Sequence, residues 1–335
     1  MRSALTAVAI AAALILAFFG GRASVPATTP ASVAQSATNS TSGKLGNAAE
    51  RTTADAPRAL AAASQSKEPL PAPGTPLKQV MAELQARAES GDAEAASRLF
   101  RDTQRCAEVR RFSTSLPRMT HVVLDQMPRG SSRNALKEQD RVLEVMQKMI
   151  AFTQDNAALC AGLSAEETNQ AFPQALRAAQ LGDADAADCY LTVNLFDLPG
   201  LIDHPGWLTT YKENALTIAS AAVARGDWLA VLKLHQAYET GTSSSTLLGQ
   251  TTGAAPVLSY RYFKLLQLGL GSDSSSITAS YFSDDEAKRV LRDVPLDAAR
   301  DAETWAQDIY RRNFSANPQH HVMERRHDCP LTTNF

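Results

Sequence analysis

Residues 88–95 read AESGDAEA and residues 179–186 read AQLGDADA, two copies of the pattern A-x-x-G-D-x-x-A. Residues 223–230 read VARGDWLA, a third copy in which Val replaces the first Ala. Glycine suits the position just beyond a helix C-terminus, where the backbone turns left-handed, and aspartate suits the N-cap of the next helix. Each copy therefore predicts a tight junction between two helices. The predicted junctions are Gly91-Asp92, Gly182-Asp183 and Gly226-Asp227.

The spacing of these glycines indicates a repeated unit. Gly226 follows Gly182 by 44 residues, and Gly269, which we expect to close a helix over 260–268, follows Gly226 by 43. The interval from Gly91 to Gly182 is 91 residues, close to two such units. Fixed periods of this size are typical of helical repeat arrays, in which each unit buries its apolar face against its neighbours. The alternative is one helix–turn–helix corner that recurs by chance in an alanine-rich chain.

These residues resemble the Sel-like repeat family, short relatives of tetratricopeptide repeats, over residues 76–270. The third copy matches furthest, at Gly226, Asp227, Ala230, Leu234, Tyr238, Gly241 and the helix 260–269. The stretch 240–256, rich in Ser, Thr and Gly, departs from the family's G-x-G-V-x-x-D turn. The resemblance implies an all-α fold, an α-solenoid of antiparallel helix pairs. It also implies protein binding or scaffolding rather than catalysis.

Helical periodicity extends the all-α prediction over a body at residues 76–315. Residues 134–159 read as one amphipathic helix. Its apolar positions are Leu136, Val142, Leu143, Val145, Met146, Met149 and Ile150. Because proline cannot donate to a helical hydrogen bond, we expect Pro117 and Pro128 to bound a separate short helix at 119–127.

The residues before this body describe an export segment and a linker. The first three residues, MRS, and an apolar run over 4–21 match a secretory signal, and the run is also long enough to span a bilayer. We expect residues 1–23 to be a cleaved signal peptide or an uncleaved anchor in the inner membrane; a buried core helix is the alternative. Residues 24–75, rich in Ala, Ser, Thr and Pro, predict a disordered linker. Both export routes place the body outside the cytoplasm, and we expect a periplasmic location.

The four cysteines favour disulfides, because their number is even and the chain is expected to be exported. Three pairings are possible. We favour Cys106 with Cys160, since each lies near the end of a predicted helix in adjoining hairpins. That leaves Cys189 with Cys329, a bond that would pin the C-terminal tail, 316–335, to the second marked repeat. The alternative is four free, buried thiols.

No constellation of residues predicts catalysis, a cofactor or a metal site. The formal net charge of −2 gives no reason to expect a nucleic-acid partner. The tail carries several possible metal ligands, but their spacing matches no zinc motif. They are His320, His321, Glu324, His327 and Cys329.

We therefore expect a non-enzymatic protein of the bacterial envelope that binds an unknown protein partner. Aromatic side chains are enriched at binding hot spots, and four of them are candidates for a concave binding surface, with packing in the repeat core as the alternative. These are Trp207, Tyr211, Trp228 and Tyr238. Two rival functions remain. One is a cell-wall enzyme with its acid residue in a helical domain, and the other is a metal-binding envelope protein that uses the C-terminal histidines.

Overall fold

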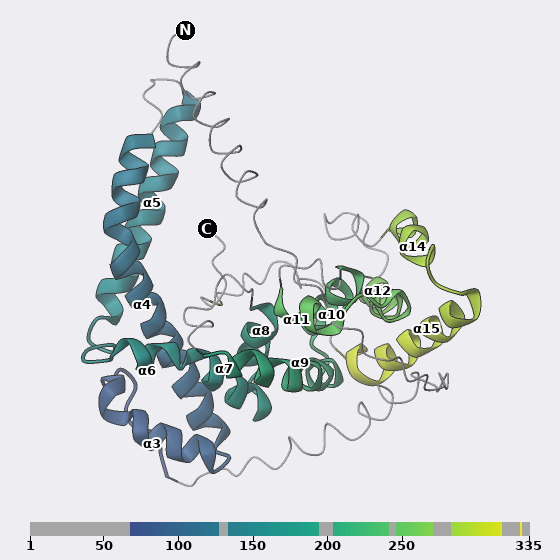
Figure 1. The fold of residues 1–335 in the computed structure, drawn as a ribbon, viewed down its shortest axis with the longest axis horizontal. Coiled ribbons are helices and arrows are strands. Elements are labelled where there is room, and N and C mark those ends of the chain that lie inside the picture. Colours follow the sequence, from purple (N-terminus) through teal and green to yellow (C-terminus); the bar gives the residue numbers. More distant parts are fainter. Residues whose placement is uncertain are drawn as a thin grey trace, which may run out of the picture. The chain divides into compact units, whose positions relative to one another are not determined.

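In the computed structural model the chain divides into two compact units, residues 1–45 and 46–335. The structure describes residues 68–126, 133–193, 204–240, 246–270, 283–316 and 329. Over these ranges the chain forms helices joined by turns and irregular connections, with no strand (Figure 1). The all-α prediction is confirmed for this part of the chain. The expected export segment and the expected linker up to residue 67 lie outside the described residues.

The last residues of the expected linker are bound to the folded body, contrary to the prediction. The guanidinium group of Arg87 donates to the carbonyls of Glu68 and Pro69, at 2.9 and 3.1 Å. Arg98 donates to the carbonyl of Ala72 at 2.9 Å. A proline-rich segment lacks N–H groups of its own to satisfy these carbonyls, so the two arginines supply the donors. The ordered body therefore includes residues 68–75.

The first three described helices are α3 (Leu77–Glu89), α4 (Ala93–Gln126) and α5 (Arg133–Asn156). α4 packs against both of the others (Figure 1). The N–H of Leu77 donates to the carbonyl of Leu159 at 2.8 Å, which ties the start of α3 to the segment after α5. A small separate core fills the space between them. It consists of Leu77, Val80, Leu84, Ala95, Leu99, Cys106 and Leu159.

α4 runs straight through Pro117, so the prediction of a separate helix at 119–127 is wrong. Proline deprives the carbonyl four residues earlier, at Ser113, of its helical donor. Both Pro117 and Ser113 are exposed, so water can bond that carbonyl. A long helix can continue through a proline when the carbonyl that loses its donor faces solvent and the neighbouring turns are packed. Phe112 of α4 supplies such packing, because its ring meets Phe152 of α5 edge-on at 5.7 Å.

The remaining helices follow in short succession along the chain. They are α6 (Ala165–Asn169), α7 (Ala171–Gln180), α8 (Ala184–Thr192), α9 (Gly206–Ala224), α10 (Trp228–Thr240), α11 (Leu247–Thr252), α12 (Pro256–Leu270), α14 (Asp284–Leu291), α15 (Leu296–Ile309) and the π-helical turn η2 (Tyr310–Phe314). Neighbouring helices pack as pairs, with α7 against α8, α10 against α12 and α12 against α15. α4 also packs against α7.

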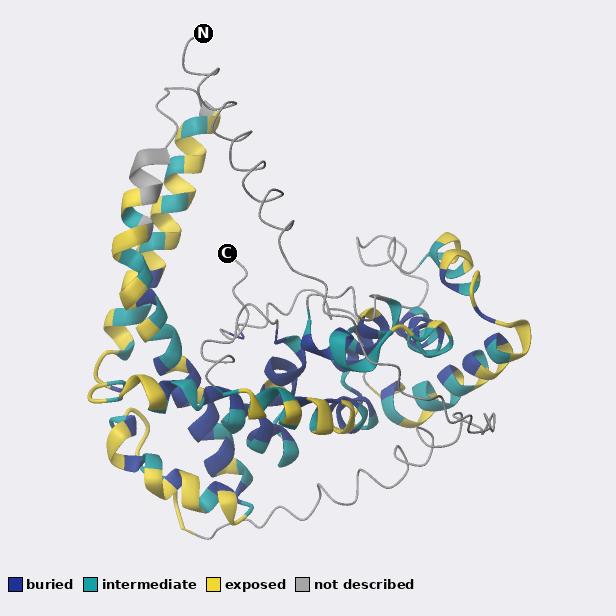
Figure 2. Cartoon of the chain, viewed as in Figure 1, coloured by how far each residue is buried: buried dark blue, intermediate teal, exposed yellow. Residues whose placement is uncertain are grey.

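One large core extends along these helices and is rich in alanine (Figure 2). α7, for example, buries Ala171, Ala175, Ala178 and Ala179 along 10 residues. Small side chains let helix axes approach closely, so the buried surface comes from many backbone and methyl contacts rather than from a few large residues. The largest fully buried side chains, Tyr190, Tyr211, Phe100, Phe263 and Phe314, fill the spaces between the helices.

Gly269 does not close a helix, which corrects the expected period. α12 continues through this residue to Leu270. A Cβ atom at Gly269 would lie 2.3 Å from a ring atom of Trp228. Glycine therefore stands here because the first residue of α10 lies against the backbone of α12. Gly226 and Gly269 occupy different structural positions, so the interval of 43 residues does not separate equivalent junctions.

Candidate functional site

The three predicted Gly-Asp junctions share one backbone geometry. The glycines have left-handed φ angles of 97° at Gly91, 99° at Gly182 and 82° at Gly226. In each junction the N–H of the aspartate bonds a carbonyl five residues earlier, at 3.0, 3.0 and 3.1 Å. This bond, from the second residue beyond the C-cap to the last turn of the helix, is the mark of a Schellman C-terminus. The junctions join α3 to α4, α7 to α8 and α9 to α10.

The aspartates of these junctions begin the next helices. Oδ1 of Asp92 accepts from the N–H of Ala95 at 3.1 Å. Oδ1 of Asp183 accepts from Ala186 at 2.8 Å. Each bond satisfies an N–H that the first helical turn leaves without a partner.

Asp227 does the same for the third junction, where its Oδ1 accepts from the N–H of Leu229 at 2.9 Å and of Ala230 at 3.3 Å. Burial alone would raise the pKa of Asp92, but bonds from the N–H of Ala95 and from Arg87 outweigh it and lower that pKa. These carboxylates therefore hold the turns of the chain, and their oxygens are engaged in capping.

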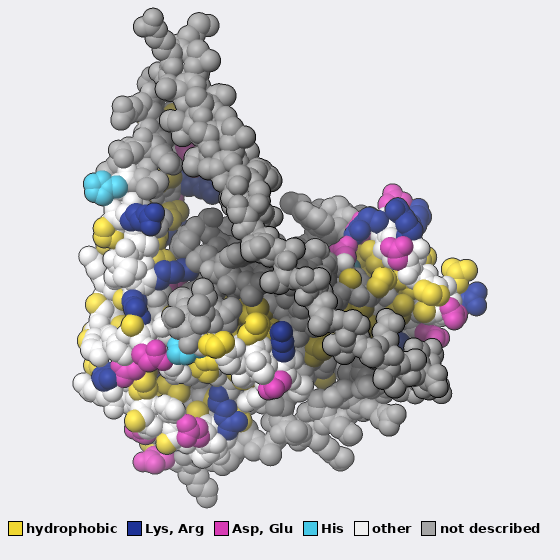
Figure 3. All heavy atoms as spheres, in the orientation of Figure 1, with side chains coloured by type: hydrophobic (Ala, Val, Ile, Leu, Met, Phe, Trp, Pro, Cys, Tyr) yellow, Lys and Arg dark blue, Asp and Glu magenta, His cyan; other side chains and the backbone are white. Residues whose placement is uncertain are grey.

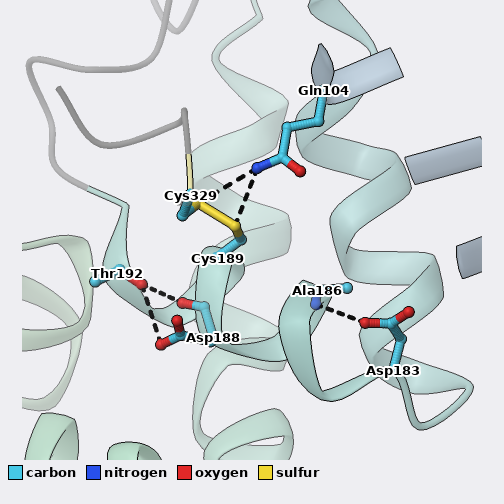
Figure 4. The surroundings of a disulfide bond; sticks show 7 residues. All are labelled: Gln104, Asp183, Ala186, Asp188, Cys189, Thr192 and Cys329. Atoms are coloured by element: carbon cyan, nitrogen blue, oxygen red, sulfur yellow. Dashed lines mark hydrogen bonds between the residues drawn. A yellow bond between two sulfur atoms is a disulfide. The ribbon is translucent and has the colours of Figure 1, made fainter. Parts of the chain in front are cut away.

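The four cysteines form two disulfides, in the pairing favoured from the sequence. Cys106 of α4 joins Cys160, which lies 54 positions later in the sequence, with a Cα–Cα distance of 5.3 Å. Cys189 of α8 joins Cys329 across 140 residues. The side-chain amide of Gln104 donates to both sulfurs of the second bond, at 3.2 and 3.7 Å (Figure 4). The tail residue Cys329 is thereby held between α8 and α4.

Two of the four aromatic residues proposed for a binding surface are core residues instead. Tyr211 is fully buried, stacks on Phe172 with ring centroids 6.3 Å apart, and meets Tyr190 at a tilt with centroids 4.9 Å apart. Trp228 is buried against Phe314, with centroids 4.2 Å apart. Their surroundings are apolar, and an aromatic ring is more stable in such surroundings than in contact with water. For these two positions the binding prediction is wrong.

The other two aromatic residues are partly buried and lie in separate clusters. His204 stacks on Trp207, with centroids 4.3 Å apart, and lies 3.7 Å from a carboxylate oxygen of Glu166. Tyr238 stacks in parallel with Tyr262 at 6.0 Å. The four aromatic residues are thus divided among three packing sites and do not form one concave surface.

One buried polar cluster has the residue types of a hydrolase, Ser, His and Glu. Nδ1 of His235 lies 3.1 Å from Oγ of Ser259 and 3.2 Å from its carbonyl. Nε2 of His235 lies 3.9 Å from Oε2 of Glu239, beyond hydrogen-bond length. Glu239 in turn bonds Arg289 of α14. Burial lowers the pKa of His235, although Glu239 opposes the shift.

This cluster joins helices and does not present a nucleophile. Ser259 has 1% of its surface exposed, so a substrate cannot reach its hydroxyl in this conformation. His235 lies on α10, Ser259 on α12 and Arg289 on α14. The cluster therefore links three helices through buried or half-buried hydrogen bonds. Among the described residues there is no group of three or more potential metal ligands, and residues 320–327 lie outside them.

The surface feature that stands out is an apolar stripe on α5. Most of the exposed large hydrophobic residues found among the described residues belong to this one helix. They are Leu136, Leu143, Val145 and Ile150, with Leu216 and Leu296 elsewhere. Figure 3 shows hydrophobic side chains at the surface in the region of the α4–α5 pair. Exposed large apolar side chains that gather on one helix make it the candidate interaction surface among the described residues.

The stripe follows from the width of the apolar arc on α5. Met149 is buried on the side that faces α4. Leu136, Leu143 and Ile150 recur every seven residues, so they form a line that turns by only about 20° per step. α4 covers one side of the helix, and this line lies on its flank, where 42 to 48% of each side chain remains exposed. We call Leu136, Leu143 and Ile150 the α5 stripe.

Two ion pairs lie along α5 itself. Lys148 bonds Glu144 at 2.5 Å, and Arg141 lies 3.9 Å from Glu138. The bond from Lys148 lowers the pKa of Glu144. α5 carries four basic and four acidic residues in all, so no single sign of charge dominates beside the α5 stripe.

The sequence pattern assigns the apolar positions of residues 134–159 to one amphipathic helix and does not separate buried positions from exposed ones. The seven-residue spacing of the α5 stripe was the signal that could have separated the exposed line from the buried one. No family model, curated protein or solved structure matches this chain. Among the described residues, no helix combines the length and the apolar character that a membrane span requires.

Proposed function

We propose that this chain is a non-enzymatic protein that binds or scaffolds other protein surfaces through the α5 stripe. The supporting observation is the concentration of exposed Leu136, Leu143 and Ile150 on one flank of a 24-residue helix. Full burial of a large aliphatic side chain is worth about 1.5–3 kcal/mol, and each of these is already about half buried, so covering the rest is worth roughly 0.7–1.5 kcal/mol each. A partner that covers them recovers much of that free energy, which makes this flank the natural contact surface.

The proposal includes an α-solenoid arrangement related to Sel-like repeats. Its support is the common geometry of the Gly91, Gly182 and Gly226 junctions, each of which turns one helix back against the next. Repeat proteins of this kind use extended surfaces rather than deep clefts for binding. The different position of Gly269 limits the repeated geometry to the three junctions.

The proposed location is the periplasm of a bacterial envelope, reached by the export segment at 1–23. The two disulfides support an oxidising compartment, because cytosolic thiols are kept reduced. Expression of the full chain with its N-terminus, followed by thiol labelling before and after reduction, tests the location. Labelling of all four cysteines without reduction in cells would contradict it.

Site-directed photo-crosslinking tests the binding function. A photo-reactive amino acid replaces Leu143, which is 44% exposed on α5, and in a matched control it replaces Leu216, which is 38% exposed on α9. We expect protein adducts from position 143 and few or none from position 216. Absence of adducts at 143, or equal adducts at both positions, would overturn the proposal.

A further inference from the structure

We infer that the α5 stripe pairs with the same stripe of a second copy of this chain, in antiparallel orientation about Leu143. The inference rests on the proposed binding function and names its partner. The juxtaposition that carries it is a line of apolar residues at every seventh position of α5, beside a flank that carries one acidic and one basic residue rather than a row of like charges.

The spacing of the line selects a helical partner. Leu136, Leu143 and Ile150 are seven residues apart, which corresponds to two helical turns of 3.5 residues each. Such a line stays in contact with a neighbouring helix that winds around it with a left-handed supercoil. A strand or an irregular loop has no matching period. The partner is therefore a helix that carries apolar residues at the same spacing.

The second copy offers such a helix in a self-complementary arrangement. A two-fold axis at Leu143 places this residue opposite its own equivalent, and it places Leu136 opposite Ile150 of the second copy. All three contacts are then between aliphatic side chains. Closed two-fold contacts of this isologous kind are the commonest form of protein self-association.

The polar residues beside the stripe permit this arrangement. One helical step to either side of the line, Gln139, Met146, Gln147, Thr153 and Gln154 are uncharged, Asp140 is acidic and Arg133 is basic. A two-fold axis brings identical flanks together, so a strongly charged flank would repel itself. The amide-rich flank avoids this repulsion, and Gln147 lies at the height of Asp140 of the second copy. A partner selected by charge would instead require unpaired charges of one sign along the stripe.

The available length suits a stable contact. At about 1.5 Å per residue, the 24 residues of α5 extend over roughly 36 Å. Two antiparallel pairs, each about 20 Å wide, would bury roughly 700 Å² per copy, close to the roughly 800 Å² typical of specific interfaces. The α4–α5 pairs of two copies would then form a four-helix bundle, an arrangement in which each helix buries a broad apolar arc.

Charge substitution at the two-fold axis tests this pairing on the oxidised full chain without its export segment. Sedimentation velocity over a concentration series should show a dimer for the unchanged protein. Leu143→Glu places two carboxylates opposite each other and should weaken the dimer at least about tenfold. Leu216→Glu, on α9, is the matched control and should leave the dimer unchanged. Circular dichroism establishes that each variant is folded.

A mixing experiment identifies the two-fold contact directly. Leu143→Glu and Leu143→Lys should each be monomeric alone, and an equimolar mixture should restore a dimer. A dimer that survives Leu143→Glu, or a mixture that stays monomeric, would overturn the inference.

Photo-crosslinking from position 143 separates the failure of the inference from the failure of the proposed function. Adducts of twice the chain mass support the second copy. Adducts with other proteins alone retain the binding function but overturn the inference, and absence of adducts overturns both.

Discussion

Substitution of Gly269 by alanine tests the contact between α12 and the first residue of α10. The added Cβ would lie 2.3 to 2.7 Å from three ring atoms of Trp228, far closer than ordinary van der Waals contact. The ring cannot move away easily. It is buried, and its other neighbours are Phe314, with centroids 4.2 Å apart, and Tyr310, at 6.3 Å.

Two opposing effects determine the expected free energy of unfolding. Alanine favours a helix over glycine by up to about 1 kcal/mol, and less near a helix end such as this one. Overpacking a rigid core site typically costs about 1–3 kcal/mol. The overlap involves three atoms of an aromatic ring, so overpacking should win. We expect Gly269→Ala to destabilise the folded body by about 1–2 kcal/mol, or roughly 2–8 °C in melting temperature.

Urea unfolding followed by circular dichroism measures this change, and a double-mutant cycle assigns its cause. Trp228→Leu removes the ring that meets the new methyl group. The cost of Gly269→Ala should therefore become smaller in the Trp228→Leu background than in the unchanged protein, with a coupling of about 1 kcal/mol or more. If Gly269→Ala instead stabilised the protein, or cost the same in both backgrounds, the close approach of the two helices would be refuted.

Three further predictions concern other parts of the fold. Asp227→Ala removes the acceptor for two N–H groups at the start of α10 and should cost about 0.5–2 kcal/mol in a thermal melt; an unchanged melting temperature would remove its capping role. Replacing Cys106 and Cys160 together by serine opens a 54-residue loop and should cost about 4 kcal/mol of unfolding free energy, whereas free thiols at both positions in peptide maps of the oxidised protein would contradict the pairing. Burial lowers the pKa of His235, so the unfolded chain takes up the proton more readily. Stability should fall as pH decreases below about 6.5, and less so in His235→Gln; equal slopes would exclude this histidine as the cause.

Local signals in the sequence predicted the junctions because two residues determine the geometry there. Glycine permits the left-handed φ angle at Gly182, and the carboxylate of Asp183 bonds an N–H within the same turn. Neither effect depends on distant parts of the chain. The all-α class followed from the same kind of local pattern.

Non-local contacts explain the errors. The neighbouring sequence does not distinguish a glycine that ends a helix from one that leaves room for an aromatic ring. Gly269 is of the second kind. The ring of Trp228, which lies 41 residues earlier in the chain, packs against it. Pro117 is compatible with α4 because its side of the helix is exposed. Tyr211 and Trp228 are buried because of helices that close over them, and residue type alone does not reveal this.

The interaction surface is an intermediate case, because part of it follows from helical geometry alone. Leu136 and Val145 are nine residues apart, so at about 100° per residue they lie on opposite sides of one helix. A single neighbouring helix covers an arc of only about 100°. Since α4 covers the side that carries Met149, both flanks of α5 must remain exposed unless another surface meets them. Under the proposed binding function, the exposed part of this arc is the contact surface, and the regular spacing of Leu136, Leu143 and Ile150 favours a helix as its partner. The apolar positions of α5 therefore suit contacts with two neighbouring helices, of which the described part of the chain provides one.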